Sequence, residues 1–274
     1  MQPAKRAVLV LGMHRSGTSL CSRIVNLMGF EAPRTLMPPT EANAEGYWES
    51  ALISQLNDKL LAECGVLWHA RGPLAADPFT VARRTGLYGA LRGAIASEFG
   101  GAERIVLKDP RICRLVPLYE DLLTDAGYRI VSVIALRNPA EVAASLAKRD
   151  QMKTERSVRV WLRYTLEAER ATRGRARAVV AYEDVVRDWR TLAVRLAEVM
   201  DLPAEEFVAR AEGEAPKAVR PDLRHHALAL PAPISLFRLL SRRVYHSMRK
   251  LVDEPNDVVA ARQLDRQMVL FEMF

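Results

Sequence analysis

Short, mainly apolar runs alternate along the chain with longer segments in which apolar residues recur at helical spacing. The apolar runs cover residues 7–11, 104–107, 130–136 and 178–181. Runs of this length predict strands that are buried on both faces, as in a parallel sheet. Helical spacing predicts helices over residues 18–28, 51–63, 81–99, 139–150, 154–172, 184–200 and 234–251. We therefore expect an α/β fold: a single domain with a central parallel β-sheet flanked by helices on both faces.

A glycine-containing loop, GMHRSG, joins the first predicted strand to the first predicted helix. The backbone N–H groups of such a loop and of the first helical turn point at one spot, which binds a phosphate or a similar anion. Thr18 and Ser19 add hydroxyl groups there, and Arg15 adds a fixed positive charge. A Walker A loop has lysine after its second glycine, whereas Gly17 is followed here by Thr18. The pattern predicts an anion site that lacks the lysine of ATPases.

A second anion site is predicted where the third apolar run, residues 130–136, ends in Arg137. Asn138 suits the N-cap of the helix that follows. Ser145 and Arg149 are four residues apart, so they share a face of this helix. Two guanidinium groups and a hydroxyl at a helix start suit a phosphate, because the planar guanidinium fork matches phosphate oxygens.

The predicted strands all end next to polar residues. Gly12, Lys108, Arg137 and Tyr182 each follow one of the four apolar runs. In open α/β sheets ligands bind at the carboxyl ends of the strands, so we expect these four positions to surround one crevice. For the turn that begins at Lys108, KDP, the alternative interpretation is a salt-bridged surface turn.

Three of these motifs resemble those of sulfotransferases that use 3′-phosphoadenosine 5′-phosphosulfate (PAPS), a family with a P-loop-like fold. GMHRSGTSL resembles their 5′-phosphosulfate loop, and KDP resembles the strand-end lysine motif of tyrosylprotein and related sulfotransferases. The spacing of Arg137 and Ser145 resembles their 3′-phosphate motif, and Arg149 matches a further arginine of the tyrosylprotein branch. The resemblance implies that PAPS is bound by His14, Arg15, Ser16, Gly17, Thr18, Ser19, Arg137, Ser145 and Arg149.

The resemblance also implies a reaction. A sulfuryl group would pass in line from PAPS to a hydroxyl or amine of an acceptor, without a metal, while Arg15 and Lys108 stabilise the charge on the bridging oxygen. We expect a small-molecule or glycan acceptor, with a carbohydrate or glycoconjugate favoured by similarity to bacterial sequences. The residues alone leave two other functions open: an ATP-dependent P-loop phosphotransferase and a non-catalytic nucleotide-binding module.

The candidate general base lies in the stretch NAEGYWES, residues 43–50, which resembles an N-x-x-G-[FYW]-x-E stretch of bacterial sulfotransferase-like sequences. Glu49 is the first candidate, Glu45 and Glu41 follow it, and His14 is a rival. Alternatively, Glu49 only stabilises the start of the helix over residues 51–63. Two interpretations are also open for Trp68 and His69: they line an acceptor pocket, or they anchor a loop on the core.

Composition narrows the partners and the compartment. The formal net charge of the 274-residue chain is +7, but the chain shows no zinc-finger, RNP or heptad pattern, so we expect no nucleic acid partner. Neither a signal-peptide pattern nor an apolar run long enough to cross a bilayer occurs, so we expect a cytoplasmic protein. Cys21, Cys64 and Cys113 lack metal-ligand spacing and are expected to be reduced and buried.

The end of the chain carries an excess of basic residues. We expect residues 1–202 to form the α/β core and residues 203–274 a mostly helical extension. The family usually closes its nucleotide site with a late loop, and residues 220–226, RPDLRHH, lie at about that place. The basic amphipathic helix over residues 234–251 has three possible partners: the core, another subunit or an anionic membrane.

Overall fold

The central element is a four-stranded sheet whose strands are all parallel. The computed structural model describes residues 5–40, 43, 46–219 and 228–274. Its strands are β1 (Lys5–Leu11), β2 (Arg104–Lys108), β3 (Tyr128–Leu136) and β4 (Arg177–Ala181), in the order β2-β1-β3-β4. In the centre of the sheet Val8 of β1 lies opposite Val106 of β2 and Val131 of β3. The predicted α/β fold with a parallel sheet is confirmed.

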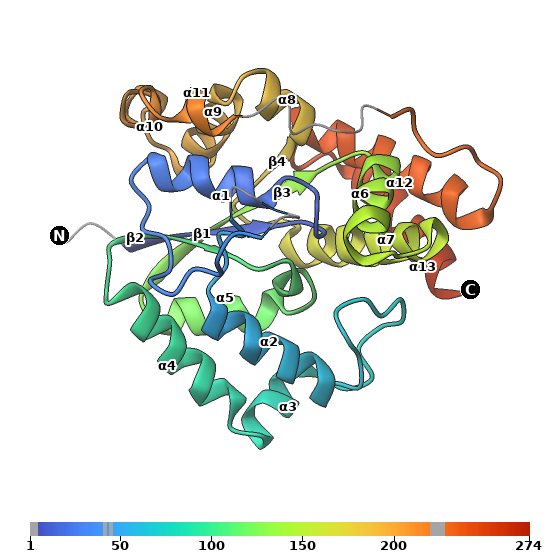
Figure 1. Cartoon of the computed structure of the whole chain (residues 1–274), viewed down its shortest axis with the longest axis horizontal. Helices are drawn as coiled ribbons and strands as arrows, with labels where there is room; N and C mark the ends of the chain where they lie inside the picture. Colours follow the sequence, from blue (N-terminus) through green and yellow to red (C-terminus); the bar gives the residue numbers. More distant parts are fainter. Residues whose placement is uncertain (1–4, 41–42, 44–45, 220–227) are drawn as a thin grey trace.

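Helices cover both faces of this sheet, because successive side chains of a strand point to opposite sides. Val8 and Val10 face a core that is shared with one group of helices, whereas Leu9 and Leu11 face a larger core on the other side. The first group contains α1 (Thr18–Leu27), α9 (Arg190–Met200), α10 (Ala204–Ala211) and α11 (Ala215–Ala218). The second contains α2 (Ala51–Glu63), α3 (Pro78–Arg84), α4 (Leu87–Phe99), a 3-10 helix (Pro110–Arg114), α5 (Val116–Asp125), α6 (Pro139–Asp150) and α7 (Thr154–Thr172). Figure 1 shows α1 and α9 above the strands and α2, α4 and α5 below them.

Two segments that the periodicity predicts as single helices are each two helices. The helix predicted over 81–99 is divided into α3 and α4 at Gly86, which has a φ of 76°. The helix predicted over 184–200 is divided into α8 (Tyr182–Arg187) and α9 at Asp188, whose backbone is extended. The Asp188 carboxylate accepts the Arg190 N–H at 3.1 Å, so it satisfies a backbone donor at the start of α9. The apolar spacing continues through both breaks, which is why it predicts one helix in each case.

The last two helices pack on the core. The apolar side chains Phe237, Leu240 and Val244 of α12 (Leu236–Asp253) are buried, and this helix packs against α7, β4 and α13 (Val258–Glu272). Of the three possible partners of the basic helix, the structure therefore supports the core. Membrane contact through its apolar face is not supported, because these side chains are already covered. The late loop predicted over residues 220–226 lies outside the described residues. Of the helices that the structure describes, none is both long and apolar enough to span a membrane.

Two glycines allow the loop after β1 to pass close to its neighbours. Gly12 has a φ of 142°, and a Cβ atom there would lie 2.7 Å from the carbonyl oxygen of Ala135 in β3. Gly17 has a φ of 89°, and a Cβ atom there would lie 2.3 Å from the ring of Tyr182. Side chains are strained at such φ values, and real Cβ atoms do not approach that closely. Both positions therefore require glycine for this loop to lie across the ends of β1 and β3.

We predict that Gly12→Ala lowers the free energy of unfolding by about 1–3 kcal/mol, because it adds backbone strain and a clash with β3. Chemical denaturation of the purified variants measures the change. The matched control is Gly93→Ala on the exposed side of α4, where a Cβ atom meets nothing within 4 Å. That variant should be more stable than wild type by about 0.5–1 kcal/mol, since alanine favours a helix interior. Equal stability of Gly12→Ala and wild type would contradict the close approach.

Candidate functional site

The carboxyl ends of β1 and β3 form a topological switch point. The chain leaves β1 toward β2 on one side of the sheet and leaves β3 toward β4 on the other. The helix that follows β1 and the helices that follow β3 also belong to cores on opposite faces. Adjacent strands whose connections diverge in this way leave a crevice at their carboxyl ends, where α/β proteins bind ligands. The loop 12–17 and Arg137 both lie at this edge of the sheet.

The loop itself is held by its backbone. The Gly12 N–H donates to Cys113 Sγ at 3.0 Å, and the Ser16 N–H donates to the Met13 carbonyl at 3.0 Å. Arg15 adopts a φ of 70°, a conformation that is uncommon for residues other than glycine and that occurs often at functional sites. α1 then starts behind Gly17 without a side-chain cap. The first N–H groups of α1 can therefore bind an anion.

Arg15, Ser145 and Arg137 meet beside this loop. Arg15 Nε donates to Ser145 Oγ at 2.8 Å, and Arg137 Nη1 donates to the Arg15 carbonyl at 3.0 Å. Arg137 also pairs with Glu141 at 2.9 Å and lies over the ring of Tyr182, 4.3 Å from its centre. These contacts fix the position of both guanidinium groups. The three residues come from the loop, the end of β3 and α6, so the structure joins segments about a hundred residues apart or more.

Positive charge is crowded in this part of the crevice. Burial, together with the guanidinium groups of Arg149 and Arg137, lowers the pKa of Arg15 below its ordinary value. Arg149 itself pairs with Asp150 at 2.7 Å and lies 5.9 Å from the centre of the Trp68 ring. Three guanidinium groups therefore act on one another at the mouth of the loop. A bound anion would relieve this repulsion.

Lys108 and Glu49 form a second, buried cluster at the end of β2. Lys108 Nζ donates to Glu49 Oε1 at 2.5 Å and to the Tyr47 carbonyl at 2.7 Å, and it lies 3.4 Å from Ser19 Oγ of α1. Both ionic side chains are nearly inaccessible to solvent, with 2% and 5% of their surface exposed. Burial raises the pKa of Glu49 above its ordinary value, and the charge of Lys108 opposes that shift. A carboxylate, a lysine and the start of α1 thus meet at one point.

The N-cap of α2 is Ser50, not Glu49. Ser50 Oγ accepts the Ile53 N–H at 3.1 Å and donates to Glu98 of α4 at 2.7 Å. Glu49, one residue earlier, points instead to Lys108. The alternative, in which Glu49 only stabilises the start of this helix, is therefore not supported, because Ser50 caps the helix and Glu49 contacts Lys108. The other two glutamates that are candidates for the general base, Glu41 and Glu45, lie outside the described residues.

Arg111 supports this cluster and is the residue that the sequence reasoning missed. It pairs with Asp58 at 2.6 Å and with Asp109 at 2.9 Å, and it approaches Glu49 to 3.6 Å. Asp109 also accepts from Asn57 of α2 at 3.0 Å. The KDP turn is therefore salt-bridged at both charged residues, Asp109 to Arg111 and Lys108 to Glu49, and it is buried instead of lying on the surface. Arg111 directly follows KDP in the sequence, and this run of charged residues is the pattern that could have indicated its role.

His14 is buried beside the rings of Trp68 and Tyr164. Its ring is 4.6 Å from that of Trp68, and within the part of the chain that the structure describes its Nε2 atom has no hydrogen-bond partner. Burial, followed by the charges of Arg111 and other nearby basic residues, lowers the pKa of His14 well below its ordinary value of 6.5. The remaining loop residues Ser16 and Thr18 are buried, and the three cysteines are free and buried as predicted.

No protein-family profile and no curated protein matches the chain. Among solved structures, it is similar to the sulfotransferase domain from the Synechococcus PCC 7002 olefin synthase, with 15% sequence identity and a TM-score of 0.48 over 90% of this chain and 97% of that chain. It is also similar to the sulfotransferase domain from the curacin biosynthetic pathway, with 16% identity and a TM-score of 0.46 over 87% of this chain and 96% of that chain. Similarity at this level leaves the function to be argued from the residues of the crevice.

The buried His14 predicts a pH dependence of stability. The folded chain holds this ring neutral, whereas the unfolded chain protonates it near pH 6.5, so the unfolded state binds more protons below that pH. Stability should therefore be lost as the pH falls below 6.5, by up to about 1.4 kcal/mol per pH unit from this group. Denaturant unfolding of wild type and His14→Asn at pH 7.5 and 5.5 measures the contribution.

The expected result is a smaller loss of stability between the two pH values in His14→Asn than in wild type. The matched control is His246→Asn, which removes an exposed histidine of α12 and should leave the wild-type loss in place. Equal losses in wild type and His14→Asn would contradict a neutral, buried ring.

Proposed function

We propose that this chain is a PAPS-dependent sulfotransferase that transfers a sulfuryl group to a hydroxyl or amine of a small-molecule acceptor. The observation that carries the proposal is the arrangement of cations around the loop: Arg15, Arg137 and Arg149 gather beside it, and Lys108 lies beside the first turn of α1. A ligand with two separated anionic groups fits two such groups of cations. The loop lacks the lysine that a nucleoside triphosphate would require.

The residues fit the donor in two places. Backbone N–H groups of Gly17, Thr18 and Ser19 would hold the 5′-phosphosulfate, because they lie at the start of α1, which has no side-chain cap. Arg137 and Ser145 would hold the 3′-phosphate, with Arg149 beside them. Arg137 uses its Nε and Nη1 atoms within the protein, and these contacts orient its guanidinium plane.

Lys108, Arg15 and Glu49 would carry the chemistry. PAPS supplies an activated sulfuryl group, whose transfer leaves negative charge on the oxygen that bridges to the 5′-phosphate. Lys108 and Arg15 would stabilise that charge from fixed positions in a site of low dielectric, an effect worth about 10²–10³ in rate for each donor. Glu49 would take the proton of the acceptor group. Its pKa is raised by burial, which strengthens it as a base, and Lys108 keeps its carboxylate oriented.

The acceptor group would lie near Glu49, because a base must reach the proton that it removes. Lys108 contacts both Glu49 and Ser19 in the first turn of α1, so one side chain would link the base to the donor site. The sulfuryl group would then pass from the donor at the loop to the acceptor beside Glu49. A carbohydrate or glycoconjugate remains our proposed acceptor class on the resemblance to bacterial sequences.

Donor binding tests the proposal. By calorimetry, adenosine 3′,5′-bisphosphate should bind at least about tenfold more tightly than adenosine 5′-phosphosulfate, because only the former engages the 3′-phosphate residues. Arg137→Ala and the milder Ser145→Ala should reduce that preference. Arg129→Ala, at the exposed opposite end of the same strand, is the matched control and should retain it.

The same measurement distinguishes the competing functions. Tighter binding of ATP with magnesium than of adenosine 3′,5′-bisphosphate would favour a phosphotransferase and reject our proposal. Binding of the bisphosphate without release of it from PAPS, across a panel of alcohols, amines and sugars, would favour a non-catalytic module. Ser145→Ala leaves the pair of Arg137 and Glu141 in place, so it remains informative if Arg137→Ala unfolds.

We predict that Glu49→Gln lowers kcat by about 10²–10⁴ while the affinity for adenosine 3′,5′-bisphosphate stays within about twofold of wild type. In wild type kcat/KM should rise with pH through the raised pKa of Glu49, since only the carboxylate accepts a proton. This acidic limb should be absent in Glu49→Gln. Asp58→Asn alters the same Arg111 network from a half-exposed position and should keep the limb. If kcat/KM of Glu49→Gln still rises with pH in this range, a group other than Glu49 is the general base.

A further inference from the structure

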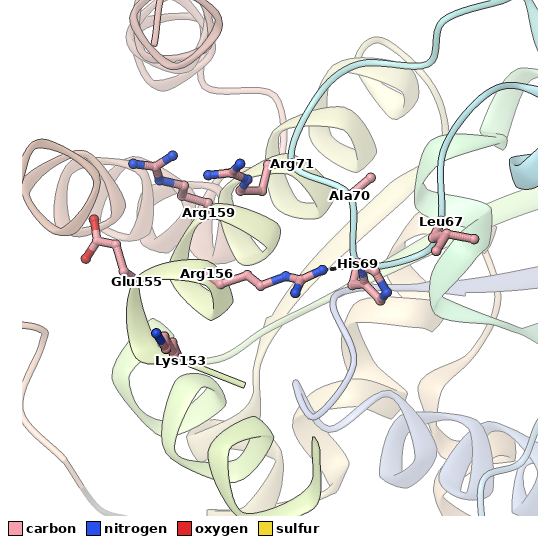
Figure 2. A pocket seen from close by; sticks show the side chains of 8 residues that line it. All are labelled: Leu67, His69, Ala70, Arg71, Lys153, Glu155, Arg156 and Arg159. Carbon is pink, nitrogen blue, oxygen red and sulfur yellow. Dashed lines mark hydrogen bonds between the residues drawn. The ribbon is translucent and has the colours of Figure 1, made fainter. Parts of the chain in front are cut away.

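A basic pocket of about 710 Å³ lies next to the crevice. It is formed by the loop that follows α2 and by the first two turns of α7. Figure 2 shows Arg156 reaching from α7 to His69 of the loop, with Arg71 and Arg159 drawn above them. The lining residues are Leu67, His69, Ala70, Arg71, Lys153, Glu155, Arg156 and Arg159. Four of these carry a fixed positive charge, so the pocket has the composition of an anion site.

Glu155 is the one carboxylate in the lining, and its charge is neutralised by a residue outside the pocket. Glu155 pairs with Arg238 of α12 at 3.4 Å and accepts a hydrogen bond from Ser235 at 2.9 Å. It is therefore engaged by a residue that does not line the pocket. The four cations of the lining have no described carboxylate of their own within ion-pair distance. The net charge that a ligand meets in the pocket is positive.

Two of the arginines are held in place. The guanidinium of Arg159 stacks on Phe237, 3.6 Å from the centre of the ring, and its Nε atom is buried with no partner among the described residues. Arg156 Nη2 lies 2.5 Å from His69 Nδ1. Arginine loses less side-chain entropy on binding when its planar fork is already oriented. Such a preorganised pair suits the oxygens of a phosphate or a carboxylate.

The pocket is linked to the donor loop through one aromatic residue. Trp68 precedes His69, and its ring contacts His14 of the loop at 4.6 Å and faces Arg149 at 5.9 Å. The Trp68 carbonyl accepts the hydroxyl of Tyr164 at 2.7 Å, which ties this part of the loop to α7. The charges of Lys108 and Arg111 also act on His14, so the ring that Trp68 contacts lies near the reacting groups. A molecule that occupied it would extend past Trp68 toward the reacting groups.

We infer that this pocket selects an acceptor that already carries an anionic group, a phosphate or a carboxylate, in addition to the hydroxyl or amine that receives the sulfuryl group. The inference rests on the proposed function for the role of the bound molecule, but the anion site itself does not. Arg156 and Arg159 would bind the anionic group, and Lys153 and Arg71 would add long-range attraction. A neutral acceptor would leave these charges without a counterpart.

The test is calorimetric titration of the full chain, saturated with adenosine 3′,5′-bisphosphate so that the donor site is occupied. Inorganic phosphate and citrate are the two probes, because they separate a phosphate preference from a carboxylate preference. We expect saturable binding of at least one of them with one site per chain. The double variant Lys153→Gln with Arg156→Gln should weaken that binding at least about tenfold, since it removes one charge-assisted partner and one nearby positive charge.

The matched control is Arg170→Gln with Lys250→Gln, which removes the same two charge types at exposed positions outside the pocket lining. It should bind the probe as wild type does. Loss of affinity in both double variants would mean attraction to net charge only and would overturn the inference, as would the absence of saturable binding in wild type. Donor affinity is measured in the same preparations. Donor binding without probe binding rejects the pocket alone, whereas probe binding without donor binding rejects the proposed function alone.

Discussion

The buried pair of Lys108 and Glu49 is the interaction on which the crevice depends. Moving either charge out of water is unfavourable by several kcal/mol, and only a close partner with further hydrogen bonds offsets that penalty. Here the offset comes from 2.5 Å contact between the two groups, the Tyr47 carbonyl and the nearby Arg111. The pair fastens the segment before α2 to the end of β2 and to the first turn of α1. Segments that share no secondary structure are thereby held at one point.

The guanidinium groups beside the loop show the opposite situation. Arg15, Arg137 and Arg149 are close enough for their charges to oppose one another, and Arg137 has an internal counterion in Glu141. The fold keeps them together through contacts made by the backbone of Arg15 and the hydroxyl of Ser145. Such an arrangement is less stable than one without like charges, so binding of an anion would be coupled to stability of the fold.

The sheet and the loop were predictable because their signals are local. Apolar runs fix the strands, and glycines with the polar residues between them fix the turn into α1. The breaks at Gly86 and Asp188 were not predictable from apolar spacing, which continues through them. Likewise, the partners of Arg111 and the pocket around Arg156 depend on how α2, the loop after it and α7 pack together. That information lies in tertiary contacts, and no local pattern in the sequence contains it. Glu49 is an intermediate case: a motif pointed to it, and only the fold showed that it faces Lys108.

The contact between Glu155 and Arg238 gives the end of the chain an influence on the pocket that it does not line. Arg238 lies in the first turn of α12, yet it cancels the only carboxylate in the lining. A neutral or acidic residue at this position would return that negative charge to the pocket without altering its shape. Under the proposed function, substitutions in α12 would thus alter acceptor selectivity while the residues that line the pocket stay the same. Engineering of acceptor preference can begin there, outside the pocket itself.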